Sequence, residues 1–515
     1  MPKPQPSHLE VERTFTAERS TQLPDLLGGQ VTELREVHDI TLEATYHDTE
    51  DLRLLGAGIT LRRREGGDDE GWHAKVAVGS SRLELHRPLT KAAAPPVAMR
   101  RLLRGVVRDA ALVPVSHVRT RRSRLHLLGS DGTVLAELAR DQVTSQRLLG
   151  QLDPALEGAP DGAMHWDELE VELVDGDLDV LENLTHVFAE HGIVESDSPS
   201  KLRRSLGDLA PAIAATPSKR STAGEVVSVY LSQQWGRVLR HDVRLRAGQP
   251  DAVHRMRTSA RRLRSALASY RALLDADRTR EVESQLRRLG QELSAARDLQ
   301  VADRLLADTL AADEPAADSE AAARVTRRLM ATRRRSAAGH VEAYLGSDDY
   351  LRLLDDVGSF VAAPAFSDRA RRPAGREVRK QVMKAHRKVV RRWDVAASHD
   401  LDERAEALHA TRKATKRLRY ACEVALPTLG KPAGRMRRRA KELSGLLGER
   451  QDAVVLKQRI VELLPQATKG RAGSRVAFAL GRLHARMDAR IVDLDMRAAR
   501  ASRRVRARKV VSGLA

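Results

Sequence analysis

The chain has 515 residues and a formal charge of +19, with 42% apolar, 31% charged and only 3% aromatic residues. This length exceeds one ordinary hydrophobic core, so two or more domains are expected, and the composition is typical of folded chains. A single cysteine, Cys422, excludes an intrachain disulfide and favours a cytoplasmic location, and no apolar run is long enough to predict a membrane span.

The charge is distributed unevenly along the chain. Up to residue 207 there are 25 Lys and Arg against 34 Asp and Glu, and after it 64 against 36. Residues 207–224 (GDLAPAIAATPSKRSTAG) show no sustained periodicity, whereas alternating segments precede them and segments with a 3.6-residue period follow. The sequence therefore predicts an α+β protein with a mostly-strand domain over 1–207, a linker over 208–224 and a basic, all-helical domain over 225–515.

The first predicted strand is HLEVERTF, residues 8–15. With a period of two, Glu10 and Glu12 share one face with Thr14, and Leu9, Val11 and Phe15 share the other. Two neighbouring carboxylates are common on a solvated strand, but they also suit a divalent metal ion. The strand alone leaves both interpretations open.

Later strands repeat this pattern of nearly ionic faces. A solvated antiparallel sheet alternates in the same way, but here the signs are sorted, with acidic strands first and last and basic strands between them. Buried without a ligand, such faces would be costly, so the pattern favours an interior that holds a polyanion through Mg²⁺ or Mn²⁺. The residues on these faces include Arg62, Arg64, His73, Lys75, Arg82, Glu84, Arg119, Arg121, Asp141, Glu168, Glu170 and Glu172.

The segments EVERTF, TLRRREGGDDEGWHAKV, RLELHRPL and DELEVELV, with SPSKLRRSLG after them, resemble the CYTH domain of the triphosphate tunnel metalloenzymes. The resemblance covers about the first 207 residues and implies an eight-stranded antiparallel barrel that uses Mg²⁺ or Mn²⁺ to hydrolyse or cyclise triphosphate substrates. By position it implies metal ligands at Glu10, Glu12, Asp141, Glu170 and Glu172, with Glu12 or Glu172 as the catalytic base. It implies triphosphate-binding residues at Arg62, Arg64, Lys75, Arg82, Arg119, Arg121 and Lys201.

One position departs from the family pattern. The E-x-E-x-K signature requires a lysine at position 14, where this chain has Thr14. The neighbouring Arg13 has the wrong parity to replace that lysine without a shift in strand register.

The helical part contains an internal duplication. AVHRMRTSARRLRSALASY (252–270) aligns with ALHATRKATKRLRYACEVA (407–425), which places His254 on His409, and Asp298 aligns with Asp452 in a second repeated segment. The repeat predicts two helical bundles, over about 225–315 and 320–515. In each copy a histidine and three cations fall on one helix face. Such faces are often simply solvated, but like charges held this close favour an anionic ligand.

The paired H…R…RRLR and H…R…KRLR blocks resemble the CHAD domain, the conserved-histidine α-helical domain. The resemblance covers roughly residues 225–510 and implies two pseudo-symmetric halves around a basic groove that binds inorganic polyphosphate, with some members associated with polyphosphate granules. The residues it places in that groove are His254, Arg257, Arg261, Arg262, Arg264, His409, Arg412, Lys413, Lys416, Arg417 and Arg419.

Together these observations predict a metal-dependent triphosphatase, acting on inorganic triphosphate, joined to a polyphosphate-binding domain. A catalytically inactive polyphosphate-binding or granule-associated protein is the alternative that Thr14 supports. Adenylate cyclase activity ranks lower, because nothing in the sequence selects an adenine. Nucleic-acid binding is favoured by charge alone, and the scarcity of aromatic residues counts against it.

Overall fold

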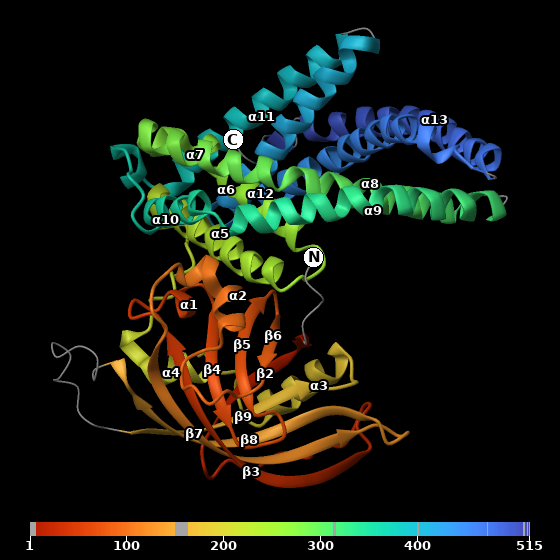
Figure 1. The fold of residues 1–515 in the computed structure, drawn as a ribbon. Coiled ribbons are helices and arrows are strands. Elements are labelled where there is room, and N and C mark those ends of the chain that lie inside the picture. The colour runs from red at the N-terminus through yellow and green to blue at the C-terminus, as the bar shows by residue number, and fades with distance from the viewer. Residues whose placement is uncertain are drawn as a thin grey trace. The chain divides into compact units, whose positions relative to one another are not determined.

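The computed structural model describes residues 7–149, 163–312, 316–398, 401–470, 472–507, 510–511 and 513. These described residues form two compact units, the first within 7–213 and 239–250 and the second within 214–238 and 251–513 (Figure 1). An antiparallel sheet dominates the first unit, and helices form the second. The predicted layout of a β domain followed by a helical domain is confirmed.

The first unit contains one nine-stranded antiparallel sheet in the order β1-β6-β5-β4-β3-β7-β8-β9-β2. Its strands are β1 (Ser7–Glu10), β2 (Glu12–Ala17), β3 (Glu33–Asp48), β4 (Ile59–Glu65), β5 (Gly71–Val78), β6 (Ser81–Arg87), β7 (Val113–Leu128), β8 (Val134–Arg147) and β9 (Met164–Leu173). Its helices are α1 (Arg53–Gly56), α2 (Val97–Val107), α3 (Leu178–Glu190) and α4 (Lys201–Leu206), followed by a 3-10 turn at Gly207–Leu209.

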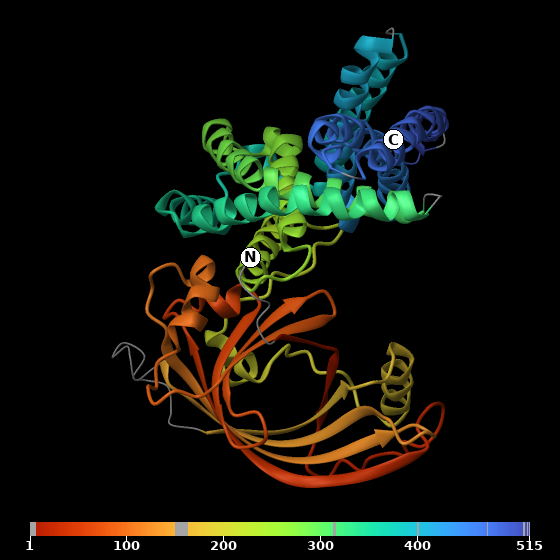
Figure 2. The same cartoon turned by 45° about the vertical axis from the view of Figure 1, so that its right-hand side comes forward.

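The sheet closes on itself through the strand that opens it. β1 pairs with β6, where Glu10 lies opposite Arg82, and β2 pairs with β9, where Glu12 lies opposite Glu172. Only Val11 separates β1 from β2, so the two ends of the strand order are consecutive in the chain. Figure 2 shows how the sheet curves round. The predicted eight strands become nine because the first one is interrupted at this residue.

Apolar side chains pack on the outer face of the sheet. Phe15, Leu169 and Val171 belong to a buried cluster with Phe188 of α3, whose ring lies 4.8 Å from that of Phe15 in an edge-to-face arrangement. Because side chains alternate along a strand, this packing directs Glu10, Glu12 and the glutamates of β9 to the inner face.

α4 packs against the inner face. Leu202 of this helix is buried with Val118 of β7 and Val143 of β8. Val143 lies two residues from Asp141, and Val118 lies four residues from Arg122, so all four share the inner face. One part of this face is therefore apolar and covered by a helix, and the rest carries charges.

The second unit is built from helices. They are α5 (Ala223–Arg246, whose last residues belong to the first unit), α6 (Ala252–Tyr270), α7 (Ala276–Glu292), α8 (Ser294–Ala311), α9 (Ala316–Gly346), α10 (Asp348–Ala362), α11 (Ala374–Ser398), α12 (Leu401–Ala467) and α13 (Gly473–Arg506), with 3-10 turns at Arg271–Leu273 and Asp368–Arg371. α12 breaks at Gly430, where the backbone has φ 53° and ψ −131°. Among the helices in the described ranges, none is long and apolar enough to cross a membrane.

α6 and α12 carry the two copies of the repeated motif, and they pack against each other. The Tyr270 hydroxyl at the end of α6 donates a 2.7 Å hydrogen bond to the Ala421 carbonyl of α12. Buried apolar residues at helical spacing, such as Met256, Leu263 and Leu267, form the packed face of α6. The duplicated segments are thus neighbours in space as well as in pattern.

Candidate active site

The opening pair of carboxylates contacts two cations on the inner face. Lys75 Nζ lies 2.7 Å from Glu10 Oε2 and 3.5 Å from Glu12 Oε2, and Arg82 donates a hydrogen bond to Glu12. The Glu10 and Glu12 side chains are only 5% and 7% exposed. The structure thus brings together four of the residues predicted from the sequence.

A second contact network surrounds Glu84, which lies on this face between basic neighbours. The His73 ring lies 2.9 Å from the Glu84 carboxylate, and the Arg62 guanidinium lies 3.9 Å from it.

Burial raises the pKa of Glu10 to about 7, and the nearby Glu84 carboxylate contributes to this increase against the effect of Lys75. Arg64, paired with Asp69, has its pKa lowered to about 9 by burial and by Arg62.

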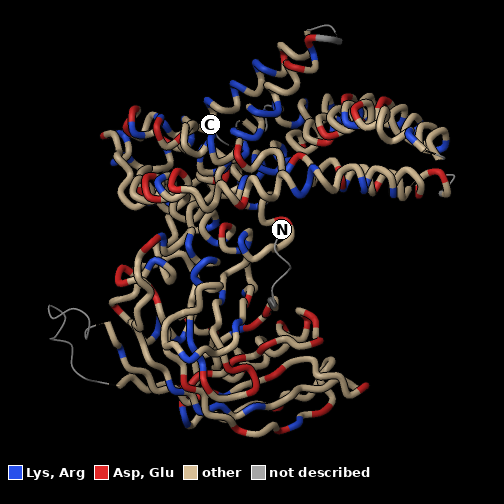
Figure 3. Tube along the Cα trace, viewed as in Figure 1, with Lys and Arg blue, Asp and Glu red and all other residues tan. Residues whose placement is uncertain are grey.

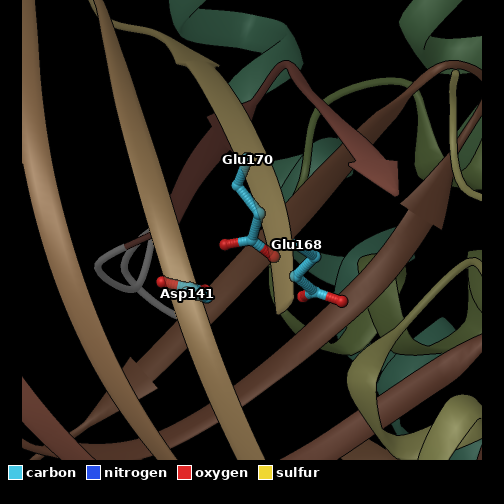
Figure 4. Close-up of side chains that lie close together, drawn as sticks. All are labelled: Asp141, Glu168 and Glu170. Carbon is cyan, nitrogen blue, oxygen red and sulfur yellow. The ribbon is translucent and has the colours of Figure 1, made fainter. Parts of the chain in front are cut away.

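Asp141, Glu168 and Glu170 form the acidic cluster. One oxygen from each lies within 4.8 Å of the others, with Asp141 from β8 and both glutamates from the neighbouring β9 (Figure 4). Carboxylate oxygens this close could hold one Mg²⁺ or Mn²⁺ ion. Glu168 was not among the predicted ligands, although it shares the alternating face with Glu170.

Three cations of the protein already contact the acidic cluster, and the most distant of them is Arg204, 3.7 Å from Glu168. Lys201 Nζ lies 2.9 Å from Asp141, 2.5 Å from Glu168 and 2.6 Å from Glu170. Arg122 forms a two-pronged ion pair with Asp141, at 2.7 and 2.6 Å, and also binds Glu170. Although burial alone would raise it, Lys201 and Arg122 hold the pKa of Glu170 well below its usual range.

The structure corrects the placement of two predicted phosphate-binding residues. Arg119 and Arg121 lie on the outer face and are exposed, and Arg119 pairs there with Glu43 at 3.2 Å. Their neighbour Arg122 faces inward instead. The parity of β7 is set by Val118 and Thr120, which are buried on the inner side at 1% and 4% exposure. Arg119 and Arg121 therefore cannot contact a ligand inside the sheet.

Thr14 faces inward and lies opposite Glu170 in the pairing of β2 with β9. Arg13 faces α3 instead, where its guanidinium donates a 2.6 Å hydrogen bond to the Thr185 hydroxyl. Arg13 therefore does not replace the signature lysine. The cations beside Glu170 are Lys201 of α4 and Arg122 of β7.

Glu172 lies on the inner face opposite Glu12. Burial raises its pKa, with Glu170 and Glu84 adding to the shift against the effect of Lys75. A carboxylate with a raised pKa accepts a proton more readily at neutral pH than an exposed one. This favours Glu172 over the ion-paired Glu12 as a proton acceptor.

In the second unit, α6 and α12 bring their cations close together. The predicted polyphosphate-binding residues that interact across this contact are Arg261, Arg264, Arg412, Lys416 and Arg417. His254 and Arg257 interact with Arg261 on α6, and His409 interacts with Arg412 and Lys416 on α12. These eight residues are called the basic cluster. Burial, followed by the charges of Arg412 and Arg261, lowers the pKa of Lys416 to about 7. Burial, followed by Arg297 and Arg261, lowers the pKa of His254 to about 4.

Three of the predicted residues differ from the basic cluster in their surroundings. Arg262 and Arg419 both bind Glu423, at 3.3 and 3.2 Å, so their charges are partly neutralised within the protein. Lys413 is exposed beside the cluster.

Carboxylates and further cations lie at the edge of the basic cluster. Asp298 pairs with Arg257 at 3.5 Å. Arg297 of α8 and Lys388 of α11 were missed, although their charges act on His254 and on the neighbourhood of Arg417 respectively. The only signal for them in the sequence is the general abundance of Lys and Arg in the helical part. Lys and Arg residues are spread over many helices of the second unit (Figure 3).

A closed sheet with ionic inner residues, together with duplicated basic helices, is the architecture of a CYTH–CHAD protein, and the chain belongs to this class. The CYTH family model matches residues 8–206 and the CHAD model matches residues 229–461. CYTH domains belong to the metal-dependent triphosphate tunnel metalloenzyme superfamily.

Particular relatives are similar to the chain along most of their length. The uncharacterized proteins MT2285 and Rv2226 of two Mycobacterium tuberculosis strains are each 32% identical to the chain over 503 residues, covering 93% of both sequences. Among solved structures, the CHAD domain from the plant Ricinus communis matches with a TM-score of 0.45 and 28% identity, over 57% of this chain and 96% of that one. PptA from Streptomyces chartreusis matches with a TM-score of 0.45 and 20% identity, over 55% and 99%.

Proposed function

We propose that the CYTH domain is a divalent-metal-dependent triphosphatase that hydrolyses inorganic triphosphate, and that the CHAD domain binds inorganic polyphosphate. The observation that carries the first part is the contact between Glu10, Glu12, Lys75 and Arg82 on the inner face of a closed sheet. Carboxylates and cations placed side by side suit a substrate that is itself a polyanion held partly through a metal ion.

The carboxylates fit such an ion. Glu10 Oε2 is buried, and although Lys75 Nζ lies 2.7 Å away, this oxygen accepts no well-directed hydrogen bond from the described residues. Glu10 and Glu12 would hold Mg²⁺ or Mn²⁺, which supplies positive charge against the phosphate oxygens.

The remaining chemistry falls to side chains of the chain itself. Lys75, Arg82 and Arg62 would bind the phosphate oxygens and orient the terminal phosphoryl group. Glu172 would take a proton from the attacking water as the new P–O bond forms, and the bond to the bridging oxygen would break to leave pyrophosphate. The cations would stabilise the negative charge on that leaving group, so positioning and electrostatics supply most of the rate.

The test is turnover by the purified full chain. Tripolyphosphate, ATP and long-chain polyphosphate would each be incubated with Mg²⁺ or Mn²⁺, while phosphate, pyrophosphate and cyclic AMP are measured. We expect phosphate release from tripolyphosphate that is lost, by about 100-fold or more, in the Glu10→Gln/Glu12→Gln double variant, because removing charges that act on the transition state typically costs this much. Polyphosphate binding by the variant should be unchanged.

A matched control is the Glu43→Gln/Glu65→Gln double variant. These two carboxylates lie opposite each other on the neighbouring strands β3 and β4, on the outer face near Arg119 and Arg63. This control should retain wild-type turnover. Normal turnover in the Glu10/Glu12 variant would rule out the metal assignment.

A second candidate function is supported by Thr14. This residue leaves the inner face without the signature lysine next to Glu170. A protein with this substitution could bind polyphosphate without hydrolysing it. No turnover of any substrate in the same experiment, together with tight polyphosphate binding, would favour this second candidate.

The polyphosphate-binding proposal rests on the basic cluster. Arg261 of α6 acts electrostatically on Arg412 and Lys416 of α12, so cations from both copies of the motif lie close together. Their mutual repulsion raises the free energy of the unliganded protein, and a chain of phosphates would relieve it. Because the cluster joins two helices, a linear polyanion could contact both at once.

A further inference from the structure

The most unusual feature of the inner face is the position of the Lys201 ammonium group. It lies within 3 Å of a carboxylate oxygen from each of Asp141, Glu168 and Glu170. These are the same three residues whose oxygens are close enough together to hold a metal ion. A cation that belongs to the chain therefore lies where a divalent ion would bind.

α4 holds Lys201 firmly in this position. The Ser200 hydroxyl caps the helix by accepting a hydrogen bond from the Arg203 backbone N–H at 3.2 Å. The Ser205 hydroxyl hydrogen-bonds that of Ser116 on β7 at 2.7 Å, and Leu202 is fully buried. Lys201 is consequently part of a docked helix, and its side chain is only 10% exposed.

Charge balance makes Lys201 and a divalent ion compete for the acidic cluster. The three carboxylates carry three negative charges, and Lys201, Arg122 and Arg204 already supply three positive ones. A divalent ion bound to the same oxygens would lie next to the ammonium group, and like charges repel strongly at such distances in a poorly hydrated interior. Occupation by one cation therefore excludes the other.

We propose that Lys201 is a tethered cation that fills the acidic cluster and prevents a divalent metal ion from binding there. The cluster then stabilises α4 against the inner face, and divalent ions bind elsewhere on that face. Because Glu170 lies opposite Thr14, Lys201 also supplies a positive charge beside the position that lacks the signature lysine. This inference rests on the metal dependence in the proposed function, but its test does not require turnover.

The experiment counts Mn²⁺ bound to the full chain, by equilibrium dialysis with electron paramagnetic resonance detection of free Mn²⁺. We expect the Lys201→Met variant to bind one more Mn²⁺ per chain than the wild type. In EDTA the variant should melt at least about 5 °C lower, because three carboxylates, two of them buried, lose their shared partner. Mn²⁺ should raise its melting temperature by several degrees more than it raises that of the wild type.

Two control variants separate this effect from a general loss of helix packing. Arg203→Met removes a cation from the same helix, but Arg203 binds the Pro211 carbonyl and not the acidic cluster, so this variant should bind as many Mn²⁺ ions as the wild type. Lys201→Arg keeps the positive charge and should do the same. If Lys201→Met folds only when Mn²⁺ is present, the proposal is supported.

Equal Mn²⁺ counts for the wild type and Lys201→Met would overturn the proposal. So would failure of that variant to fold in Mn²⁺ while Lys201→Arg folds normally. The outcome is separable from the proposed activity. A wild type that binds no Mn²⁺ and hydrolyses nothing would end the triphosphatase proposal, whereas an additional ion in the variant would still establish the role of Lys201.

Discussion

The guanidinium of Arg122 satisfies two carboxylates that would otherwise be buried without enough positive charge. Its two-pronged contact with Asp141 is the geometry in which arginine binds carboxylates most strongly, and its contact with Glu170 links β7 to β9. Burying a charged group costs free energy unless it is paired. Removal of Arg122 should therefore cost much more than removal of its exposed neighbour.

We predict that Arg122→Met lowers the free energy of unfolding by about 3–5 kcal/mol, as expected when one partner of a buried ion pair is removed. Arg121→Met, on the exposed outer face, should change it by less than about 0.5 kcal/mol. Urea unfolding of the full chain followed by circular dichroism would measure both values. Equal losses in the two variants would contradict the assignment of Arg122 to the inner face.

For single residues, the sequence predicts well on which face of a strand a side chain lies when apolar and charged residues alternate clearly. Glu10, Glu12 and Lys75 were placed together correctly because apolar neighbours define the opposite face of their strands. In β7 the inner and outer faces were predicted the wrong way round, because the apolar Val118 faces inward to pack against Leu202 of α4. Because a helix from a distant part of the sequence covers part of the inner face, an apolar residue in β7 marks the inner face and not the outer one.

Among the helices, the break in α12 separates the repeated basic motif from the segment that carries Asp452. Gly430 has φ 53° and ψ −131°, a conformation that side chains with a Cβ atom strongly disfavour. Pro432 follows two residues later and cannot donate a backbone hydrogen bond. The direction of the second part of α12 therefore depends on one glycine.

Gly430→Ala should lower the free energy of unfolding by about 1–3 kcal/mol, because alanine would have to adopt this strained conformation. Gly445→Ala, at an exposed position of the same element where an added Cβ would meet no atom within 4 Å, should instead raise it by about 0.5–1 kcal/mol. Thermal and urea unfolding of the two variants give a direct comparison. Stabilisation of both would show that the chain does not need the break.

The sequence predicted the repeated elements better than the breaks between them. The offset between His254 and His409 located the motif helices α6 and α12, because a duplicated motif implies duplicated structure. This offset did not indicate that Arg297 and Lys388 also lie near residues of the basic cluster. Those residues come from α8 and α11, and only the packing of helices distant in sequence brings them there.

For the molecule as a whole, the charge of the basic cluster should change near neutral pH. Lys416 loses half its charge near pH 7 in the free protein, because burial and then Arg412 and Arg261 lower its pKa. A bound polyanion would restore a higher pKa, so binding takes up a proton. The affinity for polyphosphate should therefore be greatest below pH 7 and should fall as the pH rises through 7.

We predict a loss of about 10-fold in polyphosphate affinity between pH 6 and pH 8 at constant ionic strength, the change expected for uptake of one proton. Lys416→Arg should largely remove this dependence, because arginine stays charged throughout. Lys413→Arg, at the exposed neighbouring position, should retain it. Isothermal titration with a long-chain polyphosphate measures all three, and a wild-type affinity independent of pH would contradict the prediction.

The interruption at Val11 also has a consequence for the order in which the molecule is made. Residues 7–10 can pair with β6 soon after synthesis, but residues 12–17 must wait for β9 at 164–173. Pairings this distant in sequence form slowly, and until they form the nascent sheet has unpaired edges that can join other chains. β1 and β2, which carry Glu10 and Glu12, thus also close the sheet. A nascent chain can therefore bring these two carboxylates together with Glu172 only when the sheet closes and its last edges become paired.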